Sequence, residues 1–144
     1  MTAKKMTGRS ARVSAEWGTS MQDLELFFAR YAERYMASDV DAVSAMYEAP
    51  MLALREGRVI HLADKTAVHE HLADVMAAYA RSGAARADIA ALDVVPLGKS
   101  SVFATVRWQV RDASGGLLKD FRTTYHLARV TEHWRILSYT NHDD

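Results

Sequence analysis

The stretch Ser101-Val-Phe-Ala-Thr-Val-Arg-Trp-Gln-Val-Arg-Asp112 decides the fold, because its apolar and polar residues alternate. Successive side chains of an extended strand point to opposite faces of a sheet. One face would carry only apolar side chains: Val102, Ala104, Val106, Trp108 and Val110. The other would be mostly polar: Thr105, Arg107, Gln109 and Arg111. The pattern therefore predicts a β-strand with one dry face against a core.

The same period of two continues on both sides of this stretch. Residues 86–97, 117–130 and 133–141 also carry alternating or β-branched residues, and short polar or glycine-containing segments separate them. Together with 101–112 they predict four consecutive antiparallel strands.

Upstream of Gly83 the period is helical. Apolar residues at three- and four-residue steps predict an amphipathic helix over 21–37. Asp39 would cap a short second helix that Pro50 ends, and Asp64 would cap a third over 65–82, with Gly83 as its C-terminal stop. Between them, residues 51–55 and 58–62 predict a small β-hairpin turning at Glu56-Gly57.

This order of elements predicts an α+β domain in which three N-terminal helices and a small hairpin pack on a curved antiparallel sheet. The length of 144 residues fits a single domain. We expect a mobile basic tail over residues 1–19, where Lys4, Lys5 and Arg9 lie, and one domain over 20–144.

Composition excludes several classes of function. The chain has no cysteine, which rules out disulfides and thiolate chemistry. Lys+Arg and Asp+Glu both number 18, so the positive field that attracts nucleic acid or anionic lipid is lacking. No apolar run is long enough for a membrane span or a signal peptide, and we expect a cytoplasmic protein.

Local motifs add a family resemblance. The chain has Phe27-Phe28-Ala29-Arg30-Tyr31 in the first helix, Asp39-Val40-Asp41-Ala42 and Met46-Tyr47 around the second, and Tyr125-His126-Leu127-Ala128-Arg129 before Trp134-Arg135-Ile136. In this order and spacing they resemble the nuclear transport factor 2-like superfamily, specifically its SnoaL-like bacterial members. The resemblance implies a cone-shaped half barrel of the cystatin-like type, with a pocket between the sheet and the helices.

Ketosteroid isomerase, a member of that superfamily, allows a comparison by residue. Its segments resemble Ala29-Arg30-Tyr31 and Met46-Tyr47, which implies that Tyr31 takes the place of the oxyanion-stabilising tyrosine. A gap-free count puts Arg55 at the position of the general base, and arginine cannot accept a proton at physiological pH. Glu56 could replace it only after a one-residue slip, which on a strand reverses the face. The count also puts His126 where the isomerase has a second acid donor.

The candidate site residues have ordinary structural alternatives. Tyr31 could be a core tyrosine, and His126 lies either in the pocket or on the outer face of the sheet, which many relatives use for dimerisation. Trp108 could form a pocket wall or simply pack. Arg55, His61 and Arg122 could orient an anionic or carbonyl ligand, or lie at solvated sheet edges.

Two other histidine-containing segments are not expected to form sites. In His69-Glu70-His71 the two imidazoles point about 200° apart on a helix, so they cannot share a metal ion, and His71 is expected to be half-buried. Asn141-His142-Asp143 is expected to belong to a disordered chain end.

Function follows as two open hypotheses. In the first, the protein binds a small, largely apolar organic molecule in the cone without cofactor or metal, and catalyses isomerisation, cyclisation or dehydration with Tyr31 and His126 as donors. In the second, it is a non-catalytic ligand-binding or dimeric assembly module, because a carboxylate base is missing. In either case we expect a homodimer formed through the sheet face, since the helices can cover only one of its two faces.

Overall fold

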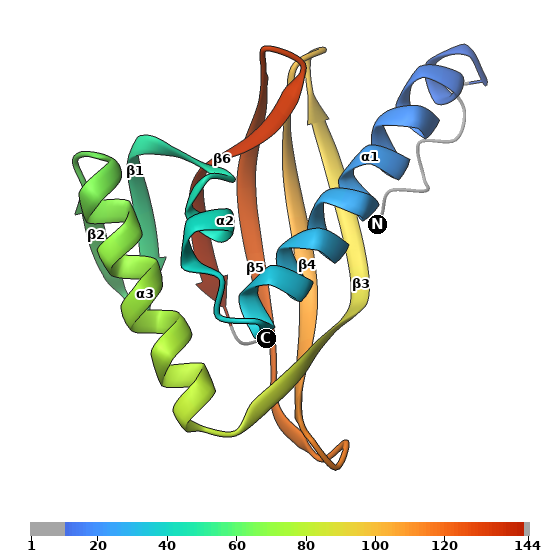
Figure 1. Ribbon diagram of the computed structural model, residues 1–144. Helices are drawn as coiled ribbons and strands as arrows, with labels where there is room; N and C mark the ends of the chain where they lie inside the picture. The colour runs from blue at the N-terminus through green and yellow to red at the C-terminus, as the bar shows by residue number, and fades with distance from the viewer. Residues whose placement is uncertain (1–10, 143–144) are drawn as a thin grey trace.

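The computed structural model describes the backbone of residues 11–142 and the side chains of residues 21–142. Its elements in chain order are α1 (Ala11–Met36), α2 (Val40–Ser44), β1 (Tyr47–Arg55), β2 (Arg58–Leu62), α3 (Lys65–Arg81), β3 (Ala84–Leu97), β4 (Ser101–Asp112), β5 (Leu117–Val130) and β6 (His133–His142). Figure 1 shows the three helices on one face of a curved sheet. The predicted α+β class is confirmed.

The sheet has six strands in the order β2-β1-β6-β5-β4-β3. Strands β3 to β6 pair antiparallel with their sequence neighbours, as the alternating pattern predicted. The hairpin was predicted as a small separate element, but β1 pairs parallel with β6 and brings it into the same sheet. The sheet is therefore mixed, and its edges are β2 and β3.

Two helix predictions also need correction. Helix α1 begins at Ala11 rather than at residue 21, so it overlaps the tail expected over residues 1–19; residues 1–10 lie outside the described part. Helix α2 ends at Ser44, well before Pro50, because the Met46 carbonyl already accepts a hydrogen bond from the Ile136 amide of β6. Pro50 lies inside β1, in the stretch between Tyr47 and Leu52 where the register with β6 shifts. A residue without an amide hydrogen is tolerated at such an irregularity.

The predicted caps and turns are present. The side chain of Asp39 accepts a hydrogen bond from the Ala42 amide, and that of Asp64 accepts one from the Ala67 amide. Gly83 follows α3 at φ +89°, a left-handed conformation that glycine adopts without a steric penalty.

The core lies between the helices and the concave face of the sheet. Val102, Ala104 and Val106 of β4 are each 0% exposed, which confirms the dry face predicted for this strand. From α1, Leu24 and Phe28 pack into the same cluster and are likewise fully buried.

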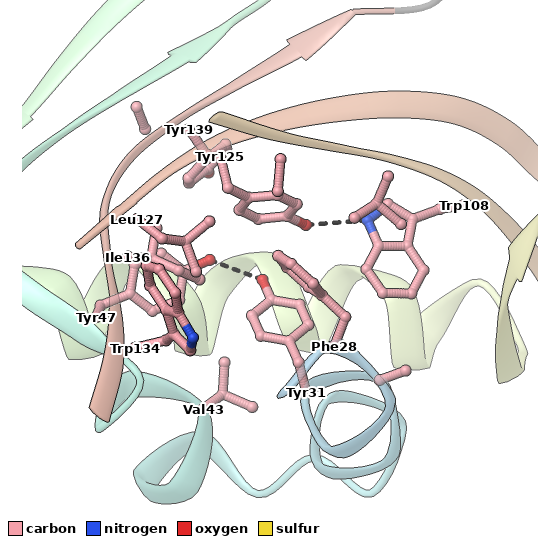
Figure 2. Close-up of a cluster of buried hydrophobic side chains, with 14 of the residues drawn as sticks. Phe28, Tyr31, Val43, Tyr47, Trp108, Tyr125, Leu127, Trp134, Ile136 and Tyr139 are labelled. Atoms are coloured by element: carbon pink, nitrogen blue, oxygen red, sulfur yellow. Dashed lines mark hydrogen bonds between the residues drawn. The ribbon is translucent and has the colours of Figure 1, made fainter. Parts of the chain in front are cut away.

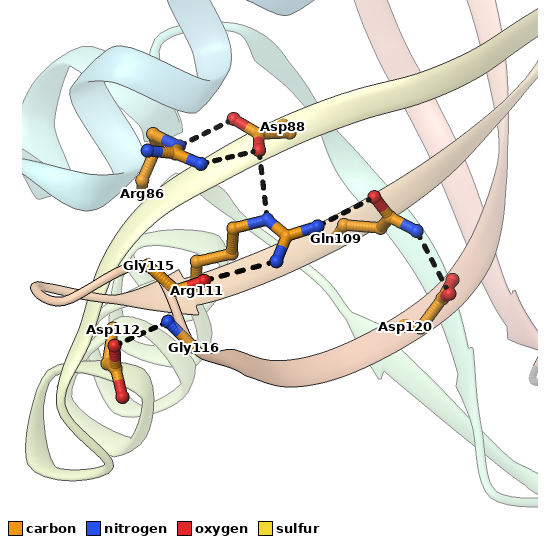
Figure 3. Close-up of polar contacts among 8 residues, drawn as sticks. All are labelled: Arg86, Asp88, Gln109, Arg111, Asp112, Gly115, Gly116 and Asp120. Carbon is orange, nitrogen blue, oxygen red and sulfur yellow. Dashed lines mark hydrogen bonds and ion pairs between the residues drawn. The ribbon is translucent and has the colours of Figure 1, made fainter.

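The outer face of the sheet has a polar and an apolar part. Near the turn between β4 and β5, Asp120 accepts a hydrogen bond from Gln109, and Asp88 accepts one from Arg111 (Figure 3). Asp120 also accepts hydrogen bonds from Arg107. Large apolar side chains elsewhere on this face remain exposed: Leu52, Leu54, Val59, Val95 and Phe103. Among the described helices, none has the length and hydropathy required to cross a membrane.

Candidate functional site

A cavity of ≈ 50 Å³ lies between the helices and the concave face of the sheet. The chain has six tyrosines, and every one of them lines this cavity: Tyr31, Tyr35, Tyr47, Tyr79, Tyr125 and Tyr139. Trp108, Thr123 and Asn141 contribute further polar atoms to the wall, and Arg55 contributes a charge. The site is thus built from aromatic rings that carry hydrogen-bonding groups.

Secondary structure explains why the tyrosines converge. Tyr31 and Tyr35 are four residues apart on α1 and therefore share one helix face. Tyr125 of β5 and Tyr139 of β6 are direct cross-strand partners, so their side chains point to the same face of the sheet. Tyr47 begins β1 and is 1% exposed.

Two hydrogen-bonded pairs fix the inner end of the cavity (Figure 2). The hydroxyls of Tyr31 and Tyr47 lie 2.7 Å apart, and the Trp108 indole Nε1–H donates to the Tyr125 hydroxyl at 2.9 Å. The rings of Tyr31 and Trp108 are stacked, with centroids 6.0 Å apart. These contacts hold the inner wall in one arrangement.

A third cluster surrounds the hydroxyl of Tyr139. Arg55 Nη1 donates to Tyr139 Oη at 3.3 Å, and His71 Nε2 of α3 lies 2.7 Å from the same oxygen. Arg55 and Tyr79 also border a groove of ≈ 500 Å³ with Asp74 and Lys119, so this cluster lies where the cavity meets the surface.

Burial sets the protonation of the site. It raises the pKa of Tyr31, Tyr35 and Tyr47 well above the usual value, so these phenols stay protonated at physiological pH and can donate hydrogen bonds. Burial also raises the pKa of Tyr139, while Arg55 opposes that rise. The pKa of His71 is lowered, first by burial and then by the positive charge of Arg55.

Three of the predicted site residues line the cavity. Tyr31 is 6% exposed, Trp108 is 4% exposed, and Arg55 is half-buried at the opening. The residue that the comparison with ketosteroid isomerase put at the position of the general base, Arg55, thus lines the cavity. Its side chain is a guanidinium and not a carboxylate. Glu56 lies in the hairpin turn and is exposed, so it does not replace the missing base.

The placement of His126 in the pocket is wrong. Its neighbours Tyr125 and Leu127 are 3% and 0% exposed and face the core, so His126 points to the outer face. There its Nε2 lies 2.9 Å from Ser101 Oγ, and its ring contacts that of Phe103 at a centroid distance of 5.0 Å. A count along the sequence gives the alternation of β5, which is regular here, but it does not show which side of the strand is concave.

His61 and Arg122 do not line the cavity either. His61 is exposed and pairs across the hairpin with Leu52, on the outer face. Arg122 is opposite Arg107 in the β4–β5 ladder, again on the outer face. Both residues interrupt apolar runs, but the interruption alone does not show which face is concave.

Sequence reasoning missed several residues of the site. Helical periodicity makes Tyr35 a core residue and Tyr47 the end of a helix, whereas both line the cavity. Asn141 is not in a disordered end: it lies in β6, and its Oδ1 accepts a hydrogen bond from Thr123 at 2.8 Å. Asp143 lies outside the described residues. The alternation of the strand could have found them: Tyr139 and Asn141 are two residues apart on β6, so their side chains share one face of the sheet.

The chemistry of the cavity is that of a hydrogen-bond donor site. Among the described residues that line it, none is a carboxylate, and Arg55 is the charged one. Phenols, an indole and a guanidinium can hold a carbonyl or carboxylate oxygen.

The fold and the tyrosine-lined cavity define an α+β protein of the cystatin-like type. The family model described as "NTF2-like protein (DUF6841)" matches residues 22–144. The chain belongs to this NTF2-like family. No curated protein matches it.

Solved structures support the fold. A single-substitution variant of Rv3472, a protein of unknown function from Mycobacterium tuberculosis, is 19% identical with a TM-score of 0.73, over 93% of this chain and 76% of that chain. Aln2 from a Streptomyces species is 21% identical with a TM-score of 0.70, over 88% and 91%. An NTF2-like protein with a cystatin-like fold from Novosphingobium aromaticivorans is 17% identical with a TM-score of 0.70, over 90% and 85%.

Proposed function

We propose that the protein binds a small organic molecule with an apolar body, whose carbonyl or carboxylate oxygen contacts Arg55. The observation that carries this proposal is the convergence of all six tyrosines and Trp108 on one cavity that has a guanidinium at its opening. Aromatic side chains provide contact area and lose little conformational freedom on binding.

The charge of Arg55 favours an oxygen-bearing ligand. It is half-buried, it donates a hydrogen bond to the neutral hydroxyl of Tyr139, and no ion pair joins it to a carboxylate within residues 21–142. A guanidinium has five N–H donors, so Arg55 has donors left for a ligand oxygen besides the one that contacts Tyr139. A hydrogen bond to a charged group contributes about 1.5–3 kcal/mol.

Size restricts the part of the ligand that enters the cavity. A volume of ≈ 50 Å³ exceeds the roughly 10–15 Å³ that one water needs, but it holds only a few atoms. The groove beside Tyr79 and Lys119 continues from the opening and offers room for the remainder of a longer ligand. The proposed ligand therefore has one end of only a few atoms, which enters the cavity.

The experiment compares isobutyrate, isobutyramide and isopropylamine, which share a branched apolar body and differ in their polar group. Ligand-observed NMR measures binding, and the indole resonance of Trp108 reports on the site. We expect the acid to bind best and the amine worst. Arg55→Met should weaken acid binding about 10- to 100-fold. Equal binding of acid and amine, or a Trp108 resonance that none of them shifts, would contradict the proposal.

Arg58→Met is the matched control. Arg58 is exposed, pairs directly opposite Arg55 across the hairpin and does not line the cavity, so its loss removes an equal charge beside Arg55 without removing a lining group. We expect this variant to retain the preference for the acid. A similar loss in both variants would show that the effect is long-range attraction rather than recognition.

We also propose that two copies of the chain associate through the outer face of the sheet. Phe103, Leu54 and Val59 are 42%, 37% and 67% exposed there, whereas the charged side chains near Asp120 already have partners. Exposed apolar side chains gathered on one face favour an interface.

A further inference from the structure

We propose that Tyr139 is the proton-transfer group of the cavity and that His71 receives the proton displaced from it. The substrate class is a small 2-oxo acid or related carbonyl compound with an acidic C–H next to its carbonyl. The reaction is proton abstraction leading to the enol tautomer. This inference rests on the proposed binding function, because the substrate must first occupy the cavity.

Geometry is the basis for the role of Tyr139. The side chain is 5% exposed and lines the cavity, and its hydroxyl has two partners that do not compete. Arg55 can only donate, so it occupies a lone pair of Tyr139 Oη at 3.3 Å. His71 Nε2 lies at 2.7 Å, and the proposed role requires the tautomer with its proton on Nδ1, in which Nε2 accepts the hydroxyl proton.

The electrostatic surroundings keep His71 ready to accept a proton. Three groups face its imidazole: Tyr139 from β6, Arg55 from β1 and Asp74 from its own helix. Burial and then Arg55 lower its pKa, and Asp74 partly opposes them, so the ring is neutral near pH 7. Burial raises the pKa of Tyr139, so its hydroxyl keeps its proton until a substrate proton replaces it.

The guanidinium positions the substrate beside Tyr139. One N–H of Arg55 is directed to Tyr139 Oη, and other N–H groups of the same planar fork can hold a substrate oxygen. Acceptors on one guanidinium lie next to each other, so a substrate carbonyl held by Arg55 would bring its adjacent carbon beside Tyr139 Oη.

The proposed step is balanced without an oxidant or reductant. The substrate C–H bond breaks, and its proton forms the new O–H bond on Tyr139 while the original hydroxyl proton moves to His71 Nε2. The electron pair of the C–H bond remains on the substrate as an enolate, whose oxygen Arg55 stabilises. A proton returned to the enolate oxygen gives the enol, and one returned to carbon exchanges the original hydrogen for one from solvent.

The first test needs no ligand, and its measurement is made on the unmodified protein. Long-range ¹H–¹⁵N NMR of the unmodified protein at pH 7 should show the Nε2 of His71 without a proton and Nδ1 with one. Spectra of His71→Gln and His69→Gln assign the signals, because His69 is a partly exposed histidine on the same helix whose Nε2 contacts Asp41 instead. A proton on Nε2 would overturn the proposal, since that nitrogen could then not receive another.

The second test uses pyruvate in D₂O. Proton NMR follows the loss of its methyl signal by exchange, and saturation transfer in the same sample measures whether pyruvate binds. We expect exchange above the buffer rate, with a decrease of about 100-fold or more in Tyr139→Phe and His71→Gln. His69→Gln should match the unmodified protein. Exchange should decline as the pH falls below the pKa of His71, and His71→Gln should lose that dependence.

The outcomes separate the two proposals. Pyruvate that binds without exchanging would overturn the proton-transfer role while leaving the binding function intact. Pyruvate that shows no saturation transfer would refute the binding of this class and the proposed reaction together. Exchange that persists unchanged in Tyr139→Phe would assign it to another group and overturn the inference.

Discussion

The hydroxyl pair of Tyr31 and Tyr47 allows a quantitative test of the cavity wall. The two oxygens lie 2.7 Å apart, and the residues are 6% and 1% exposed. Tyr31→Phe removes one hydroxyl and leaves the Tyr47 hydroxyl buried without its partner, at a cost of roughly 1–3 kcal/mol in the free energy of unfolding. For a chain of this length that corresponds to a decrease of about 2–4 °C in Tm per kcal/mol.

The double variant distinguishes this hydrogen bond from ordinary packing. Tyr31→Phe with Tyr47→Phe removes both partners and leaves no orphaned hydroxyl, so it should lose much less than the sum of the two single variants. Urea unfolding of the four proteins measures this coupling, which we expect to be about 1 kcal/mol or more. Additive losses would show that the pair does not contribute as a unit and would refute the reasoning.

Four further outcomes are expected. The protein should not convert a Δ5-3-ketosteroid, because Arg55 replaces the base and the cavity is ≈ 50 Å³; ultraviolet absorbance of the conjugated product would contradict this. Sedimentation at micromolar concentration should give twice the 16.1 kDa chain mass, and Phe103→Asp should shift it to a single chain, whereas a monomeric parent refutes the interface. Because the folded-state pKa of His71 is lowered, its contribution to stability should be lost as the pH falls from about 6.5 through that pKa; urea unfolding of His71→Gln should lack this loss. Hydrogen bonds from Arg107 and then Gln109 lower the pKa of Asp120 to about 2, so carbon NMR should show this carboxyl titrating closer to its ordinary value in Arg107→Met.

Local sequence patterns were sufficient to predict the four consecutive antiparallel strands β3 to β6 and the N-terminal caps of two helices. Strands β4 and β5 have the predicted bounds, because an alternating pattern shows which residues of a strand point to its buried face. The parallel pairing of β1 with β6 was not predictable in this way. It joins Ala53 to Tyr139, far apart along the chain, and no local pattern specifies such a partner.

The site was predictable where a residue lies in a continuous buried stripe. Tyr31 and Trp108 belong to such stripes on α1 and β4, and both line the cavity. His126 was misplaced because its face depends on which side of β5 is concave, and that is a property of the assembled sheet. His71 was correctly expected to be half-buried, but its contact with Tyr139 depends on where α3 lies relative to the assembled sheet.

The position of β6 has a consequence for biosynthesis. The hairpin of β1 and β2 leaves the ribosome early, but the β1 edge that pairs with β6 stays unpaired until residues 133–142 have been made. Until then the nascent chain exposes the edges of β1 and β5 in addition to those of β2 and β3, and such edges pair readily with other chains. The sheet can therefore close only after β6 has been made, and the chain that still lacks this strand is the species most exposed to aggregation and to chaperone binding.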